Sequence, residues 1–249
     1  MNLNSKNFLN YKLFQFSNES KVPLNEKIII NTINAHSFNI ARKNEIFEKA
    51  LQESDILLPD GVSIVWSSWF LNGIRIRKIA GAQIFNYLIN ELNEKSGKCF
   101  FLGSSDKTLE KIRDRLHLEF PNVKVEFHSP PFKKVFNHDD NKFMLKRIND
   151  FKPDVLFLGM TAPKQEIWIF ENKDQIQANI KCGIGAVFDF YAGNIKRAPK
   201  WIVNIGLEWF YRLIKEPHRM WKRYIIGNLL FVYIILKEKC KMKASRKIN

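Results

Sequence analysis

The sequence predicts an α/β protein with a Rossmann-like, doubly wound and mostly parallel sheet, followed by a basic helical appendage. Between residues 27 and 190, apolar runs of strand length alternate with amphipathic, helix-like stretches, which is the pattern of strand–helix–strand units. After Trp201 the chain is aromatic and basic with a helical pattern, and Pro217 breaks it. We therefore expect a core over residues 1–200 and an appendage over residues 201–249.

The core divides into alternating elements. Strands are expected over residues 27–34, 55–60, 98–104, 123–128, 153–160 and 180–190. Helices are expected over residues 38–54, 61–71, 105–120 and about 164–176, with Ser105 or Asp106 as the N-cap of the third. The polar stretch at residues 138–140 is expected to be a solvated loop.

The charge points to anionic partners. The 249 residues carry a net charge of +15, and from Lys200 onward 12 Lys and Arg stand against 3 Glu. The apolar run at residues 225–236 is too short to span a bilayer, and basic residues flank it on both sides. A helix at the membrane interface accounts for both features, whereas a buried C-terminal core helix accounts only for the apolar residues.

Cysteine usage and the N-terminus predict a cytoplasmic setting. The three cysteines are widely spaced, so no disulfide framework is expected, and Cys99 and Cys182 lie in apolar runs typical of buried positions. The first residues lack the continuous apolar stretch of a signal peptide.

Common phosphate and metal motifs are missing from the sequence. It contains no P-loop, no GxGxxG after a strand, no DxD triplet and no HExxH, so neither a metal nor a cofactor is expected. A bound diphosphate would then be neutralised by cationic side chains and helix N-termini. Because no helix-turn-helix, RRM or zinc-finger pattern accompanies the charge, nucleic acid is not expected as a partner.

Polar residues gather at the predicted strand ends. Ligands bind at the carboxyl ends of such strands, so one shared crevice is expected to contain Thr32, Asn34, Asp60, Gly103, Thr161, Lys164, Gln165 and Asp189. Asp60 follows a proline and precedes a glycine, and it either caps the next helix or projects a functional carboxylate. Lys164 lies at the positive end of a helix dipole, which favours an anion site there.

Six motifs in order carry a resemblance to a known family. They are "TIN" (32–34), "LPDGVSIVW" (58–66), "KIAGAQIF" (78–85), "FFLGS" (100–104), "LFLGMTAPKQEIWI" (156–169) and "GIGAVFDFYAGNIKRAPKWIVNIGLEWFYRLIKEPHR" (183–219). The chain resembles the WecG/TagA/CpsF glycosyltransferases (glycosyltransferase family 26) over roughly residues 28–224. The resemblance implies inverting, metal-independent transfer of a sugar, typically N-acetylmannosamine, from a UDP-sugar to N-acetylglucosamine on undecaprenyl diphosphate, in teichoic acid or surface polysaccharide synthesis.

The resemblance also assigns roles to residues. Asp60 would be the general base, Thr32 and Asn34 would line its pocket, and Gln165 would contact the sugar or the acceptor. The diphosphates would be reached by Arg212 and Arg219, and also by Lys222 or Arg223. Lys78 and Gln83 depart from the arginine and aspartate expected at those positions, which predicts a difference in donor recognition. The alternative function is a related transferase that uses UDP-glucose or a UDP-uronic acid in capsule or exopolysaccharide synthesis.

Asp189 and Arg197 can be interpreted in two ways. Either Asp189 orients a neighbour in the crevice and Arg197 faces a phosphate, or the two form a structural pair that joins the core to the appendage. Glu208 is expected to be structural. Because the acceptor carries a polyprenyl tail, we expect peripheral contact with the inner face of the cell membrane through the appendage, which could also close the site as a lid. The sequence is compatible with a monomer and with a homo-oligomer.

Overall fold

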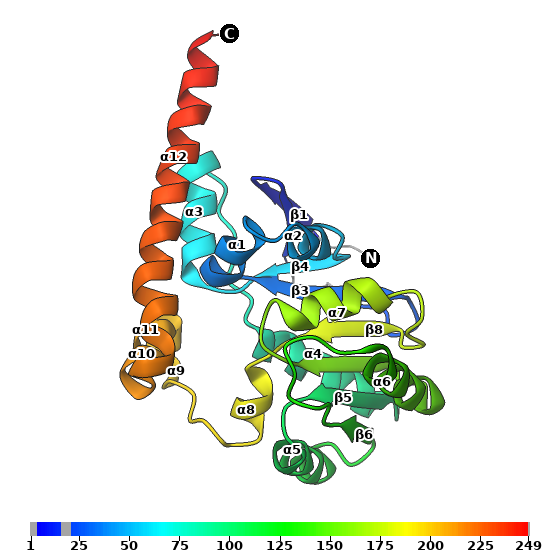
Figure 1. Ribbon diagram of the computed structural model, residues 1–249. Coiled ribbons are helices and arrows are strands. Elements are labelled where there is room, and N and C mark those ends of the chain that lie inside the picture. Colours follow the sequence, from blue (N-terminus) through cyan, green and yellow to red (C-terminus); the bar gives the residue numbers. More distant parts are fainter. Residues whose placement is uncertain (1–3, 16–20, 249) are drawn as a thin grey trace.

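One sheet organises the fold in the computed structural model, which describes residues 4–15 and 21–248 (Figure 1). Its eight strands run in the order β1-β2-β4-β3-β8-β7-β5-β6, and of the described strands only β1 is antiparallel to its neighbour. The strands are β1 (Asn4–Phe8), β2 (Tyr11–Gln15), β3 (Ile28–Ile33), β4 (Ile56–Pro59), β5 (Lys98–Gly103), β6 (Lys124–His128), β7 (Val155–Gly159) and β8 (Ile180–Gly183).

Helices cover both faces of the sheet, which is why the central strands are apolar on both sides. Their bounds are α1 (Ala35–Ala41), α2 (Glu45–Gln52), α3 (Val62–Asn72), α4 (Gly81–Glu94), α5 (Asp106–Glu119), α6 (His138–Phe151), α7 (Lys164–Asn172) and α8 (Val187–Tyr191). Helices α4, α5 and α8 pack on one face, and α1, α2, α6 and α7 pack on the other. The predicted α/β class and doubly wound sheet are confirmed.

The chain order reverses between β3 and β8. From β3 the chain adds β4 on one side, and β5 then returns on the other side beyond β8 and β7. In open parallel sheets this reversal leaves a crevice at the carboxyl ends of the strands, where ligands bind.

Several sequence expectations need correction. The helix expected over residues 38–54 is two helices, because Asn44 caps a new helix by accepting a hydrogen bond from the Phe47 amide. The strand expected over residues 180–190 ends at Gly183, and α8 follows. Residues 138–140 are not a loop but the first turn of α6, capped by Asn137. Ser105 is confirmed as the N-cap of α5, and Cys99 and Cys182 are buried.

The C-terminal helices continue from the core and return to it. They are α9 (Lys200–Asn204), α10 (Glu208–Lys215), α11 (Pro217–Trp221), a π-helical turn η1 (Lys222–Ile226) and α12 (Gly227–Ile248). Figure 1 shows α12 beside α3, with its far end projecting beyond the core. Across residues 4–15 and 21–248, no helix combines the length and the apolar character needed to cross a bilayer.

Three contacts attach α12 to the core. Phe231 is 1% exposed and meets the ring of Phe38 edge-on, with 5.3 Å between centroids. The Asn39 side-chain amide donates to the Gly227 carbonyl at 2.7 Å. Lys239 donates to the carbonyls of Phe70 and Leu71 at 2.6 and 2.7 Å, at the negative end of α3. This attachment fixes the start of α12 and therefore the point from which the preceding helices extend over the core.

We predict that Phe231→Ala lowers the free energy of unfolding by about 3–5 kcal/mol, because it leaves a cavity where α12 packs on α1. Tyr233→Ala is the control, since this side chain on the same helix is 63% exposed and should change stability by less than about 0.5 kcal/mol. Urea unfolding followed by circular dichroism measures both. Equal effects of the two variants would contradict the packing role of Phe231.

Candidate functional site

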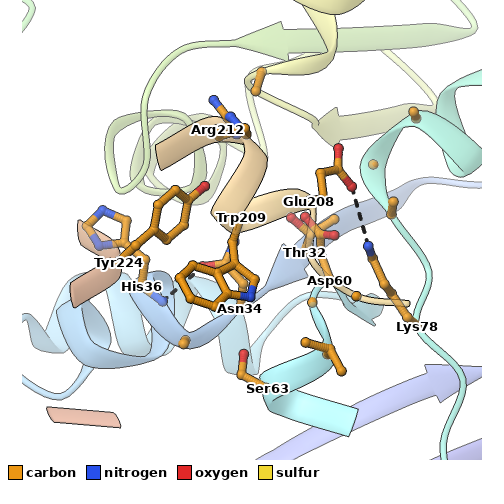
Figure 2. Close-up of a pocket in the computed structure, with 18 of the residues that line it drawn as sticks. Thr32, Asn34, His36, Asp60, Ser63, Lys78, Glu208, Trp209, Arg212 and Tyr224 are labelled. Carbon is orange, nitrogen blue, oxygen red and sulfur yellow. Dashed lines mark hydrogen bonds and ion pairs between the residues drawn. The ribbon is translucent and has the colours of Figure 1, made fainter. Parts of the chain in front are cut away.

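A cavity of about 190 Å³ lies where the ends of β3, β4 and β8 meet the C-terminal helices. The core contributes Thr32, Asn34, His36, Asp60, Ser63, Lys78 and Arg197 to its lining, and the C-terminal helices contribute Glu208, Trp209, Arg212, Arg223, Tyr224 and Asn228. Figure 2 shows Asp60 and Thr32 beside each other, with Glu208 close to them. The cavity lies at the chain reversal, so the crevice predicted from the parallel sheet is where side chains from both parts converge.

Asp60 follows the last residue of β4 and is held by the neighbouring strand. Its backbone amide donates to the Ile33 carbonyl at 2.8 Å. The N-cap of α3 is Gly61, at φ +121°, and no side chain caps this helix. The interpretation of Asp60 as a helix cap is therefore wrong. The conformation of Gly61, which L-residues rarely adopt, turns the chain so that α3 begins directly beyond the carboxylate.

Charged neighbours surround the Asp60 carboxyl group. Burial raises its pKa above the ordinary aspartate value, Glu208 raises it further, and Lys78, Arg223 and Arg197 oppose the rise. A carboxylate with a raised pKa holds a transferred proton better than an ordinary aspartate. The cavity thus contains one basic carboxylate among cations.

Glu208 joins two of these cations. Its carboxylate accepts from Arg197 Nε at 3.1 Å and from Lys78 Nζ at 3.4 Å. Burial opposes its ionisation, but the hydrogen bond from Arg197 and the charges of Arg197 and Lys78 lower the pKa of Glu208. The structural pair between Asp189 and Arg197 is therefore not formed, because Arg197 pairs with Glu208.

Arg212 and Arg223 enter the cavity from α10 and η1. Arg212 lies over the Phe190 ring and Arg223 over the Tyr224 ring, at 5.4 and 5.5 Å from the centroids. Each has a buried Nε that finds no hydrogen-bond partner among the described residues. Because a buried donor without a partner costs free energy, these two guanidinium groups suit an anionic ligand that supplies acceptor oxygens.

His36 adds a neutral group to the same wall. Burial and the charge of Arg223 lower the pKa of His36 to about 4. Its imidazole is therefore uncharged at neutral pH, and it can donate or accept a hydrogen bond without adding to the positive charge of the cavity.

Two helix N-termini also face the cavity. The start of α3 contributes Gly61, Val62 and Ser63 to the lining, and the start of α4 contributes Ala80, Gly81 and Ala82. N-terminal amides carry a partial positive charge, so they add to the attraction for an anion. Gln83 closes the first turn of α4, since its Oε1 accepts from the Ala80 amide at 2.8 Å. Gln83, which stands where the family resemblance leads us to expect an aspartate, therefore has a local structural function.

Residues 10–245 match the glycosyl transferase WecG/TagA/CpsF family. The chain belongs to this family. A Bacillus subtilis (strain 168) relative, named N-acetylglucosaminyldiphosphoundecaprenol N-acetyl-beta-D-mannosaminyltransferase, is 30% identical over 213 residues, which cover 86% of this chain and 81% of the relative. A Staphylococcus aureus (strain MW2) relative with the same name is 29% identical over 241 residues, covering 95% and 89%. The resemblance carried by the motifs is confirmed, and the chain is a glycosyltransferase.

The structure of this glycosyltransferase brings together about half of the predicted site residues. Thr32, Asn34, Asp60, Lys78, Arg197 and Arg212 line the cavity. Asn34 also caps α1, because its side-chain oxygen accepts from the amides of His36 and Ser37 at 3.0 and 3.1 Å. Asn34 therefore has two roles: it caps α1, and it lines the cavity.

The other predicted residues lie outside the lining: Gly103, Thr161, Lys164, Gln165, Asp189 and Arg219. Lys164 donates to the Lys133 carbonyl and lies 3.5 Å from the centroid of the Phe136 ring. Gly103 has φ +117°, and a Cβ there would lie 2.7 Å from the Gly159 carbonyl oxygen, so close strand packing accounts for this glycine. Arg219 forms an ion pair with Glu216.

Gln165 belongs to a buried polar group beneath the end of β8. Its Oε1 accepts from the Met160 amide at 3.2 Å, and its Nε2 donates to Glu166 Oε1 at 2.9 Å. The second oxygen of Glu166 is buried and finds no partner among the described residues. Burial raises the pKa of Glu166 to about 7. Gln165 therefore orders the turn after β7 in this structure.

Sequence reasoning missed His36, Ser63, Trp209, Tyr224 and Asn228 and gave Glu208 no role in the site. One signal could have found part of this set. Arg212 follows Glu208 by four positions and Trp209 by three, and both spacings put side chains side by side on a helix surface. The π-helical turn that directs Arg223 and Tyr224 into the cavity has no comparable sequence pattern.

We predict that Glu166→Gln removes a pH dependence of stability. In the folded state the pKa of Glu166 is about 7, against 4.5 as its ordinary value, so the folded chain binds the proton more tightly. Stability is then fully present below about pH 4.5 and falls by roughly 3 kcal/mol as the pH rises through 7. Urea unfolding between pH 5 and 8 should show a fall that is roughly 3 kcal/mol smaller in Glu166→Gln than in the wild type, and the same fall as in the wild type in Glu171→Gln, an exposed control on α7. An equal fall in all three proteins would contradict the assignment.

Proposed function

We propose that this glycosyltransferase moves N-acetylmannosamine from UDP-N-acetylmannosamine to N-acetylglucosaminyl-diphosphoundecaprenol. The names of the two relatives support the donor sugar and the acceptor. The observation that carries the proposal is the pair of buried Nε atoms of Arg212 and Arg223, which find no hydrogen-bond partner among the described residues and belong to side chains that line the same cavity as Asp60. A diphosphate supplies the oxygens that these groups lack, next to a carboxylate that can accept a proton.

The proposed reaction is a single displacement at the anomeric carbon of the donor sugar. The acceptor hydroxyl oxygen attacks from the face opposite UDP and gives its proton to the Asp60 carboxylate. The bond from the anomeric carbon to the phosphate oxygen breaks, and UDP leaves with the electron pair. The configuration is inverted, and the raised pKa of Asp60 suits the group that takes the proton.

The cavity wall stabilises the negative charge that develops on the departing UDP. Lys78, Arg197, Arg212 and Arg223 outnumber the two carboxylates, Asp60 and Glu208, and the N-termini of α3 and α4 add their partial charges. Preorganised positive charge in an enclosed site stabilises a transition state in which negative charge grows. These groups can neutralise UDP without a divalent ion.

The C-terminal helices act as a lid in this proposal. The cavity of about 190 Å³ is smaller than the roughly 300–1,000 Å³ of pockets that hold drug-sized ligands. A nucleotide sugar therefore enters when α10 and η1 move outward, and their return brings Arg212 and Arg223 onto the diphosphate. We place the boundary between the catalytic core and this appendage at residues 200–201.

The appendage also offers a surface to the membrane that holds the acceptor. Its apolar side chains Ile225, Ile226, Leu229, Val232, Tyr233 and Leu236 are 40–69% exposed, and their spacing puts them on one side of η1 and α12. Basic residues flank this strip, as they do in helices that lie on anionic lipid. We propose peripheral binding at the inner face of the cell membrane, where teichoic acid or surface polysaccharide is assembled.

We predict that Leu229→Glu combined with Leu236→Glu abolishes co-sedimentation with vesicles containing anionic lipid, because the strip can no longer enter the interface. The control is Leu118→Glu, which changes an 85% exposed leucine on α5. This variant should sediment like the wild type. Retained binding by the double variant would locate the membrane contact elsewhere.

The transfer itself is tested by UDP release from a panel of UDP-sugars, with a lipid-diphosphate-N-acetylglucosamine acceptor and EDTA present. We predict acceptor-dependent release with UDP-N-acetylmannosamine, and a loss of about 100-fold or more in Asp60→Asn, because the amide cannot take the proton. Asp114→Asn, at an exposed position on α5, is the control and should keep the wild-type rate. Turnover of UDP-glucose or a UDP-uronic acid instead would identify a different donor, and full activity in Asp60→Asn would refute the assigned base.

A further inference from the structure

Glu208 has contacts that no role proposed above explains. It is the first residue of α10, yet its carboxylate binds Lys78, 130 positions earlier in the chain, as well as Arg197. Among the ion pairs between described residues, two join residues on opposite sides of position 200, and both end on Glu208. The side chain is 17% exposed, so the bridge lies inside the cavity wall and not on an open surface.

Glu208 is poorly suited to be a base itself. Both of its oxygens are engaged by cations, and those cations lower its pKa. A carboxylate in this state holds a proton weakly. Its effect on the reaction must therefore pass through the groups that it holds.

We propose that Glu208 is a positioning residue for the transfer reaction. It closes α10 onto the core by bridging Lys78 and Arg197, and it offsets the two positive charges beside Asp60 so that this carboxylate remains basic. This inference rests on the proposed role of Asp60 as the base and extends it to a residue that neither donates nor accepts the transferred proton.

The charges around Asp60 determine the direction in which each substitution shifts the pKa of its carboxyl group. Three cations act on the carboxylate: Lys78 from the segment before α4, Arg197 from the segment after α8, and Arg223 from η1. Arg212, Tyr224 and the neutral His36 complete the titratable lining. Glu208 contributes the opposing negative charge. Removing it leaves the cations uncompensated and lowers the pKa of Asp60, whereas removing Lys78 raises it.

The first experiment measures Asp60 directly, without any substrate. The full chain is labelled with ¹³Cγ-aspartate, and the Asp60 signal is assigned by its loss in Asp60→Asn. We expect its titration midpoint to fall in Glu208→Gln and to rise in Lys78→Met. Glu208→Asp, which keeps the charge on a shorter side chain, should restore most of the wild-type midpoint. The control Glu238→Gln changes an equally buried carboxylate, 18% exposed and paired with Lys241 on α12, and should leave the midpoint unchanged.

The second experiment measures turnover against pH with UDP-N-acetylmannosamine and the lipid-linked acceptor. In Glu208→Gln we expect kcat to fall about tenfold or more, with the acidic limb of kcat/KM moved to lower pH, because the base is weaker and the cations are no longer held. A purely structural role would lower the rate equally at every pH and leave the limb in place. Glu208→Asp should recover part of the rate.

The outcomes separate this inference from the proposed function. An Asp60 midpoint that is the same in the wild type and in folded Glu208→Gln overturns the role of Glu208, whatever the substrate. The expected midpoint shifts, combined with no turnover of any UDP-sugar by the wild type, support the coupling of Glu208 to Asp60 and refute the proposed transfer. Shifts in both the midpoint and the pH limb support both.

Discussion

The packing of α12 against α1 and α3 is the constraint on which the site depends. Phe231 is buried against Phe38, and Lys239 binds the end of α3, so α12 cannot move without exposing apolar surface. The π-helical turn and α10 precede this fixed helix, and when the site is closed they therefore lie over the ends of β3 and β4. Arg212 and Arg223 enter the cavity by this route, although they come from a part of the chain remote from Asp60.

Charge balance is the second consequence of this arrangement. The core supplies Asp60, Lys78 and two helix N-termini, and the C-terminal helices supply Glu208 with Arg212 and Arg223. Neither part alone makes an enclosed anion site. A site divided in this way can be open while substrates enter and complete only when closed, which suits the proposed transfer between a substrate from water and a substrate from a membrane.

The sequence predicted the fold class, most of the strands and the place of Asp60 in the cavity, because these depend on local patterns and on the rule that parallel strands end at one edge. It could not predict the bridge from Lys78 to Glu208, which joins residues 130 positions apart. Two local errors have simple causes. The apolar run around Ile184 resembles a strand, but Gly185 at φ +41° turns the chain into α8. Asp139 and Asp140 suggested a loop, yet behind Asn137 they are acidic residues in the first turn of a helix.

Binding of a diphosphate beneath the C-terminal helices, on Arg212 and Arg223, can be measured by isothermal titration calorimetry of UDP in the presence of EDTA. The wild type is compared with Arg212→Gln and Arg223→Gln. We expect binding without a metal ion and about tenfold or more weaker affinity in each variant, because each loses a buried charge-assisted hydrogen bond. Equal affinity in all three proteins would place the diphosphate elsewhere and refute the role of these two arginines.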